Sequence, residues 1–284
     1  MNSSFETLMN TPLCDDAKTL IRKWHTLSDN MRKADHPLSI VLPDLFWIVP
    51  SGAGKTTFLR TLTDFLHAEE TLMDFYGNVD VFEFLLGYCP QSQPFTELQR
   101  LMDTIKSAAG FRNEYRGVMC IDIDEWVGHY SDKHFTTFME YLAANSEHWL
   151  IILCVSPAKE DVLHDLQAFL SMYLRLETIR MELPSDERLV AYLETLLAEY
   201  RLAPDEQAKD LLRHTFATLR KNKHFDGYKS AQLLAKDIVY HLYSADTPPA
   251  QMLTAVTLEQ FAENSRYVQN MLFAASSSRK TIGF

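Results

Sequence analysis

A short glycine-containing segment follows an apolar run in the first quarter of the chain. Residues 45–49 are apolar, and residues 50–57 read Pro-Ser-Gly-Ala-Gly-Lys-Thr-Thr. Glycines let a backbone turn tightly enough to point its N–H groups at phosphate oxygens, and a helix beginning after Gly54 adds its positive N-terminal dipole. Lys55 would pair with the β- and γ-phosphates of a nucleotide, and the Thr56 hydroxyl would bind Mg²⁺. The segment therefore predicts a strand, a phosphate loop and a helix.

This segment departs from the usual phosphate-loop pattern at one position. The pattern G-x-x-x-x-G-K-S/T is met by Gly54, Lys55 and Thr56, but Val49 stands where the first glycine is expected. A Gly/Ser turn that binds nothing is the alternative interpretation. The apolar strand before the loop and the Gly-Lys-Thr-Thr sequence after it favour nucleotide binding. The residues predicted to hold the nucleotide are Pro50, Ser51, Gly52, Ala53, Gly54, Lys55, Thr56 and Thr57.

A second chemical element is predicted where the apolar run Gly117–Glu125 ends in carboxylates. A phosphate-loop enzyme needs an acid at the end of a nearby strand for the Mg²⁺ shell, and often a second carboxylate to orient water. Asp124 and Glu125 fit these roles in order. Asp122 competes with Asp124, because strand alternation puts both on one face, but it would leave Ile123 in the position of the base. Three acids that merely end a strand and face water are the alternative.

Helices and strands alternate through the first part of the chain. The strands predicted from apolar runs cover residues 45–49, 79–84, 117–125 and 149–156, and the helical patterns cover residues 5–32, 55–65, 98–105 and 133–144. The strands are nearly continuous in apolar residues, and helices separate them. This arrangement predicts an α/β fold with a parallel sheet that is covered on both faces.

The pattern changes at residue 184. From there the apolar residues, most of them leucines, recur at helical spacing with no convincing strand between them. In the sequence Leu-Pro-Ser-Asp at residues 183–186, the proline stops a strand, and Ser185 or Asp186 can cap the next helix. We therefore expect a nucleotide-binding domain over residues 1–183 and an all-helical domain over residues 184–284.

Composition limits the classes of function. The 284 residues are 46% hydrophobic and 23% charged, as in ordinary globular proteins. Neither a signal peptide nor a membrane-spanning run is recognised, so a cytoplasmic location without a membrane is expected. A net charge of −11 disfavours a general nucleic-acid binder, although Lys221, Lys223 and Lys229 could form a local basic patch. The four cysteines are scattered and suggest neither disulfides nor zinc.

The order of these motifs resembles that of an AAA+ ATPase. More narrowly, it is similar to the group that contains the red-type rubisco activase and the sporulation stage V protein K. The matching stretches are residues 85–88, 118–125 and 181–193, and residues 219–230, which read LRKNKHFDGYKS where the group has R-R-N-x-x-H-F-x-N-A-R-S. The resemblance covers most of the chain.

The resemblance implies a P-loop NTPase sheet in the order 5-1-4-3-2, a C-terminal helical lid, and ATP with Mg²⁺ as cofactors. It places Ser156 at the first sensor of the γ-phosphate. It places Lys229 where the family has a lid arginine, and a lysine keeps the charge but loses the two-pronged fork. Arg175 is the nearest fit to the finger arginine that reaches into a neighbouring subunit. Because the N-P-G-L/F signal is missing, a solvated strand-edge charge is the alternative for Arg175.

The loop that contains Tyr88 bears on partners. In related ring motors an aromatic side chain on this loop grips a threaded polypeptide, and Gly87 and Pro90 around Tyr88 suggest a projecting loop. The alternative is that Tyr88 and Phe84 pack beneath the loop as part of the core.

Together the motifs and the resemblance predict an enzyme, an ATP-hydrolysing AAA+ protein that couples nucleotide turnover to remodelling of a protein partner, in the manner of a chaperone. A homo-oligomeric ring is expected. In the catalytic centre Lys55 would hold phosphate, Thr56 and Asp124 would hold Mg²⁺, and Glu125 would polarise water. A nucleotide-dependent scaffold or switch with weak or no hydrolysis is the alternative. The departures at Val49 and Lys229 and the missing N-P-G signal favour it more than a complete set of motifs would.

Overall fold

The computed structural model describes most of the chain in two compact units. The described residues are 5–6, 9, 15–36, 42–73, 77–90, 96–110, 117–145, 149–245, 250–265 and 268–270. The sheet unit comprises Met1–Pro50 and Lys55–Glu182, and the helical unit comprises Ser51–Gly54 and Leu183–Phe284. Each unit is described here by itself.

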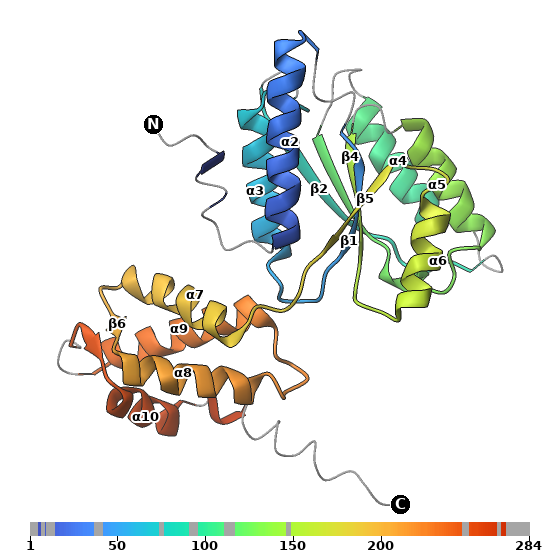
Figure 1. Ribbon diagram of the computed structural model, residues 1–284. Helices are drawn as coiled ribbons and strands as arrows, with labels where there is room; N and C mark the ends of the chain where they lie inside the picture. Colours follow the sequence, from blue (N-terminus) through green and yellow to red (C-terminus); the bar gives the residue numbers. More distant parts are fainter. Residues whose placement is uncertain are drawn as a thin grey trace, which may run out of the picture. The chain divides into compact units, whose positions relative to one another are not determined.

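Five parallel strands form the sheet of the sheet unit (Figure 1). They are β1 (Asp44–Ile48), β2 (Asp80–Leu85), β3 (Gly117–Asp122), β4 (Trp149–Val155) and β5 (Leu176–Arg180). Their order is β2-β3-β4-β1-β5, so the predicted order 5-1-4-3-2 is confirmed when the sheet is read from its other edge. Every residue of β4 is buried, because β3 and β1 flank this strand and helices cover both faces. The apolar runs of the sequence have their physical origin in that double burial.

Helices lie on both faces of this sheet. They are α2 (Asp15–Lys33), α3 (Lys55–Ala68), α4 (Thr96–Gly110), α5 (Lys133–Asn145) and α6 (Glu160–Leu170). Figure 1 shows α2 and α3 on one side of the sheet and α4, α5 and α6 on the other. Trp47 of β1 packs on Phe58 of α3 with ring centroids 4.8 Å apart, and Phe135 and Phe138 of α5 are fully buried on the opposite face. The contact between Trp47 and Phe58 holds α3 on the sheet.

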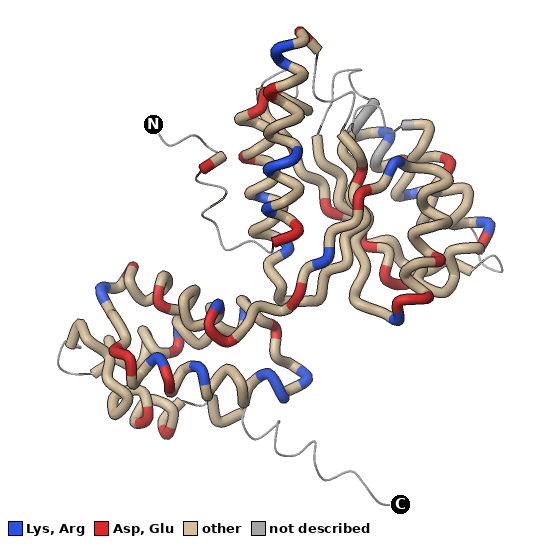
Figure 2. The backbone as a smooth tube through the Cα atoms, viewed as in Figure 1, with Lys and Arg blue, Asp and Glu red and all other residues tan. Residues whose placement is uncertain are grey.

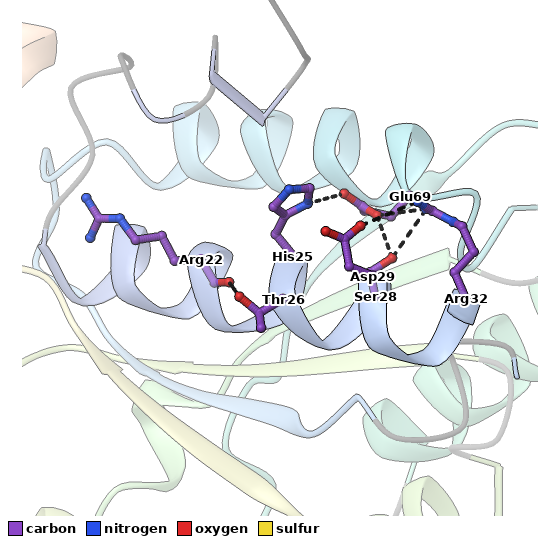
Figure 3. Close-up of polar contacts among 7 residues, drawn as sticks. All are labelled: Arg22, His25, Thr26, Ser28, Asp29, Arg32 and Glu69. Atoms are coloured by element: carbon purple, nitrogen blue, oxygen red, sulfur yellow. Dashed lines mark hydrogen bonds and ion pairs between the residues drawn. The ribbon is translucent and has the colours of Figure 1, made fainter. Parts of the chain in front are cut away.

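A buried carboxylate also fastens α2 to the end of α3 (Figure 3). The side chain of Glu69, which follows α3 directly, is only 6% exposed. It accepts a hydrogen bond of 2.5 Å from the Ser28 hydroxyl and one of 3.0 Å from Arg32, and its other oxygen lies 2.7 Å from His25 Nδ1. Three donors on one face of α2 thus compensate the burial of this carboxylate.

The third strand ends earlier than the sequence predicts. β3 stops at Asp122, and Asp124–Trp126 form a 3₁₀ turn. The Asp122 carboxylate accepts the Asp124 N–H over 3.1 Å, which turns the chain out of the strand. The carboxylates therefore lie at the strand end and in the turn after it, instead of along one face of a strand.

The helical unit contains α7 (Asp186–Ala198), α8 (Glu206–Leu219), α9 (Gly227–Tyr243) and α10 (Ala255–Asn264). The Ser185 side chain caps α7 by accepting the Arg188 N–H. In addition to these helices, the two-residue strands β6 (Ala203–Pro204) and β7 (Met252–Leu253) form a parallel pair. Basic and acidic residues are interspersed on the helices of both units (Figure 2). Among the described residues, no helix combines the length and the apolar character that a membrane span requires.

Candidate functional site

The predicted phosphate loop connects β1 to α3. Gly52 has a φ of +78° and Gly54 a φ of +98°, conformations that residues with a side chain rarely adopt. Val49, which stands in place of the first glycine, is buried, and its N–H donates to the Val155 carbonyl over 2.8 Å. Val49 thus extends the pairing between β1 and β4, and its φ is not positive. The backbone at this position does not require glycine.

Within the helical unit, the loop residues contact the start of α9. The Ser51 hydroxyl donates to Asp226 over 2.7 Å, and the Gly52 carbonyl accepts the Tyr228 N–H over 3.0 Å. A Cβ atom at Gly52 would lie 2.3 Å from the Asp226 carbonyl carbon. Both the backbone conformation and the available space therefore exclude a side chain at Gly52.

In the sheet unit, Lys55 lies among acidic groups at the carboxyl edge of the sheet. Its Nζ is 3.8 Å from Asp122 Oδ2 and 4.0 Å from Glu83 Oε2. Burial lowers the pKa of Lys55, but Cys154, Cys120, Asp122 and Glu83 together raise this pKa above its ordinary value. The ammonium group is therefore charged at neutral pH, as a phosphate ligand must be.

Two cysteine thiols, those of Cys120 and Cys154, also lie near Lys55. Cys120 Sγ and Cys154 Sγ are 3.1 Å apart, and both residues are buried. The hydrogen bond to Cys120 and burial raise the pKa of the Cys154 thiol, so this group is neutral at pH 7. We therefore attribute the negative charge around Lys55 to its two carboxylate neighbours, Asp122 and Glu83.

Each of the three predicted strand-end acids has a different partner. Asp122 faces Lys55, as described above. Asp124 accepts both the backbone N–H and the hydroxyl of Ser156, each over 2.5 Å. Glu125 Oε2 accepts the backbone N–H of Tyr88 over 2.7 Å. The fold thus brings Lys55, the three acids and Ser156 to the same edge of the sheet, because carboxyl ends of parallel strands meet there.

Arg175 lies at the other end of the strands, where β1 and β5 begin. It directly precedes β5, is exposed, and its carbonyl accepts the Asp44 N–H at the start of β1 over 2.9 Å. β1 ends at the predicted phosphate loop. The length of this five-residue strand, about 16 Å, therefore separates the Arg175 backbone from the carboxyl edge of the sheet, where Lys55 lies. Lys229 lies in the helical unit, where its Nζ is 3.8 Å from Asp226 Oδ2.

The Tyr88 ring packs against the rings of Trp126 and His129. Its centroid is 5.0 Å from that of Trp126 in an edge-on contact and 4.3 Å from that of His129 in a stacked one. The Trp126 indole N–H donates to the Gly87 carbonyl over 3.2 Å. Leu85, which lies three residues before Tyr88, exposes 71% of its large apolar side chain. Sequence reasoning named Tyr88 for client contact and did not single out Leu85.

The side chains available for a metal suit Mg²⁺. Thr56 offers a hydroxyl, and Asp122 and Asp124 offer carboxylates, which are the hard oxygen ligands that Mg²⁺ prefers. The described residues contain no group of three or more His, Cys, Asp or Glu side chains that could hold a metal by themselves. That donor set fits a Mg²⁺ ion that takes its other ligands from water and from nucleotide phosphates.

Glu83 is a charged residue near Lys55 that the sequence motifs do not indicate. The predicted strand at residues 79–84 contains it, but the alternation there is imperfect, so the sequence did not show which face Glu83 occupies. Its side chain is 50% exposed and lies on the edge strand β2. Only the pairing register of β2 with β3 shows that Glu83 lies near Lys55.

The comparisons with known proteins agree with this fold. No protein-family model matches the sequence, and no curated protein matches it. A structure of PCH-2 from C. elegans is similar, with a TM-score of 0.55 and 13% identity over 97% of this chain and 73% of that chain. An arginine-to-alanine variant of RuvB from Thermotoga maritima has a TM-score of 0.50 and 12% identity over 87% of this chain and 68% of its own. At such identities the likeness is one of fold, and with the strand order it shows the AAA+ type of P-loop fold.

Proposed function

We propose that this protein binds ATP with Mg²⁺ and hydrolyses it, in order to remodel a protein partner. The observation that carries the proposal is the position of Lys55. It begins the helix that follows a glycine-bearing loop, and its ammonium group faces Asp122 at the carboxyl edge of a parallel sheet. A helix N-terminus with a charged lysine and a nearby carboxylate is a suitable site for phosphate and Mg²⁺.

Two carboxylates compete for the metal shell. The sequence favours Asp124, followed by Glu125 as the base. The geometry supports Asp122 instead, since this carboxylate faces Lys55 whereas both oxygens of Asp124 bind Ser156. We favour Asp122 for the metal shell, with Thr56, and propose that Asp124 positions Ser156, the predicted sensor of the γ-phosphate. When bound, Mg²⁺ would neutralise phosphate charge.

Glu125 is proposed as the group that orients the attacking water. A carboxylate in this role must offer an oxygen to water, and Oε2 of Glu125 accepts the Tyr88 N–H. The other oxygen, or a rotation of the side chain, would then serve the water. The packing of Tyr88 on Trp126 and His129 holds the loop at this distance from Glu125.

The contacts of these acids also favour the second candidate, a nucleotide-dependent scaffold or switch. If Asp122 serves the metal, the next residue is Ile123, which is buried and cannot orient water. Asp124 and Glu125 are both engaged by other groups. A protein with these features would bind ATP and hydrolyse it slowly.

The remaining parts of the proposal concern assembly and location. The Arg175 backbone lies a strand length from the edge that carries Lys55, so we propose that Arg175 acts on the nucleotide of a neighbouring copy in a ring. Lys229 would contribute charge from the lid, residues 184–284. A protein client would be contacted through the loop of Tyr88, with Leu85 beside it. The narrower resemblance to the rubisco activase and stage V protein K group, a cytoplasmic location and the absence of nucleic acid from the mechanism belong to the same proposal.

The proposed nucleotide site is tested by binding. The full chain should bind a fluorescent ATP analogue in the presence of MgCl₂, and Lys55→Ala should abolish detectable binding, because Lys55 supplies the main positive charge at the phosphates. Lys133→Ala, at the start of α5, is a control for removing a lysine from a helix N-terminus. Retained micromolar affinity in Lys55→Ala would contradict the proposal.

A further inference from the structure

The edge strand β2 brings a second carboxylate, that of Glu83, close to Lys55. The register of β2 with β3 places Glu83 opposite Cys120, and that of β3 with β4 places Asp122 opposite Cys154. Side chains two residues apart on a strand share a face, as do side chains opposite each other on neighbouring strands. All four side chains therefore lie on one face of the sheet, the face on which Lys55 meets Asp122 and Glu83.

Lys55 stands between the two carboxylates without a close hydrogen bond to either. Its Nζ is 3.8 Å from Asp122 and 4.0 Å from Glu83, distances of ion pairs. The side chains of Lys55 and Asp122 are about equally exposed, at 30% and 31%, so both are partly shielded from water. One ammonium and two carboxylates leave this cluster with a formal charge of −1.

This charge opposes the binding of a nucleotide. ATP phosphates are anions and must compete with both carboxylates for Lys55. With Asp122 alone the cluster would be neutral, whereas Glu83 makes it negative. Unit charges about 4 Å apart interact even in water and more strongly near a protein surface, so one carboxylate changes affinity severalfold even after solvent screening.

We propose that Glu83 is an electrostatic positioning residue that makes nucleotide binding at Lys55 conditional on a divalent cation. The proposal rests on the nucleotide site proposed above and adds a regulation of that site. Without a divalent cation, Glu83 and Asp122 keep Lys55 engaged and repel phosphate. A divalent cation brought in with the phosphates adds two positive charges and reverses the sign of the cluster.

The test compares Glu83→Gln with Asp80→Asn. Asp80 begins the same strand and lies three residues away, on the opposite face, so its variant removes an equal charge at a different place. Dissociation constants for ATP are measured on the full chain in EDTA and in MgCl₂. Glu83→Gln should tighten cation-free binding about five- to tenfold and change binding with Mg²⁺ by less than about twofold. Asp80→Asn should change neither.

A third variant controls for an effect of misfolding on the measured affinity. Glu83→Asp keeps the charge but withdraws it from Lys55 by one methylene, and its cation-free affinity should fall between those of the wild type and Glu83→Gln. The proposal is overturned if Glu83→Gln shifts both affinities by the same factor or shifts neither. If the wild type binds no ATP even with Mg²⁺, the nucleotide site itself is absent, and the proposed function fails with it.

Discussion

Asp124 holds Ser156 by two hydrogen bonds, one from the backbone N–H and one from the hydroxyl, each 2.5 Å long. A carboxylate with both oxygens engaged in this way is poorly placed to serve a metal ion at the same time. Asp122, two residues earlier, faces Lys55 instead. Because Asp122 and Asp124 contact different groups, we expect their variants to affect nucleotide binding and turnover differently.

The first prediction separates the two aspartates. Asp122→Asn should weaken Mg²⁺-dependent ATP binding at least about tenfold, because it removes the carboxylate beside Lys55. Asp124→Asn should change binding by less than about threefold and slow hydrolysis, since an NH₂ donor replaces one of the two carboxylate oxygens that accept from Ser156. Isothermal titration with MgATP and steady-state turnover measure the two effects. A severe binding defect in Asp124→Asn beside a mild one in Asp122→Asn would return the metal role to Asp124.

The second prediction concerns Arg175 and assembly. Arg175→Ala should leave nucleotide affinity within about twofold of the wild type but reduce hydrolysis at least about a hundredfold, because the guanidinium would act on a neighbouring copy. Mixing this variant with Glu125→Gln should restore some activity, since one kind of interface then pairs an intact base with an intact arginine. Normal hydrolysis by Arg175→Ala, at concentrations where sedimentation shows rings, would instead support the scaffold function.

The third prediction is a pH dependence that arises at Asp44. The ordinary pKa of such a carboxyl is 3.8, and burial raises the pKa of Asp44 to about 7. The hydrogen bond from the Ile151 N–H lowers this pKa, but by less than burial raises it. The folded chain therefore binds more protons than the unfolded chain between these two values. The free energy of unfolding should fall as the pH rises through this window, and the cost should be complete above about pH 7.

Asp44→Asn isolates this effect, because an amide oxygen can still accept the Ile151 N–H but has no charge to bury. Urea denaturation of both proteins at pH 5 and pH 8 gives the comparison. The variant should lose less stability than the wild type between the two pH values. Equal losses in the two proteins would show that Asp44 titrates normally.

The fourth prediction concerns the carboxylate that fastens α2 to α3. Glu69→Ala should lower the free energy of unfolding by about 2 kcal/mol, because it leaves the buried Ser28 hydroxyl without its acceptor. Arg32→Ala should cost less than about 1 kcal/mol, since its side chain is 59% exposed and solvent screens the pair. Glu70→Gln, at the exposed neighbouring position, is the control. Equal effects of Glu69→Ala and Glu70→Gln in urea denaturation would refute this account.

The sheet could be predicted because its strands are nearly continuous apolar runs, and double burial leaves that mark on a sequence. The glycine-bearing loop between β1 and α3 was equally visible, since residues 52–55 combine two glycines that adopt positive φ with a lysine at a helix start. The expected strand through Glu125 was too long. The Asp124 N–H donates to the Asp122 side chain and ends the strand, and an apolar pattern does not reveal such a bond.

Two contacts between residues distant in sequence, those made by Glu83 and by Glu69, could not be predicted. Glu83 meets Lys55 only through the pairing of β2 with β3, and Glu69 meets Ser28 only because α2 packs beside α3. Each partner is an ordinary polar residue within its own segment. For Tyr88, the sequence offered both a projecting grip and a packed ring, and its contacts with Trp126 and His129 depend on how the turn after β3 folds.

The central claim is that the edge of the sheet around Lys55 hydrolyses ATP. Its most direct test is phosphate release per subunit, measured over a range of protein concentrations in MgATP, for the wild type and for Glu125→Gln, while sedimentation follows assembly. We predict that wild-type turnover per subunit rises as the protein assembles. Glu125→Gln should bind ATP at least as well and turn it over at least about a hundredfold more slowly. Turnover in the wild type no faster than in Glu125→Gln, at concentrations where assemblies form and ATP is bound, would contradict the claim.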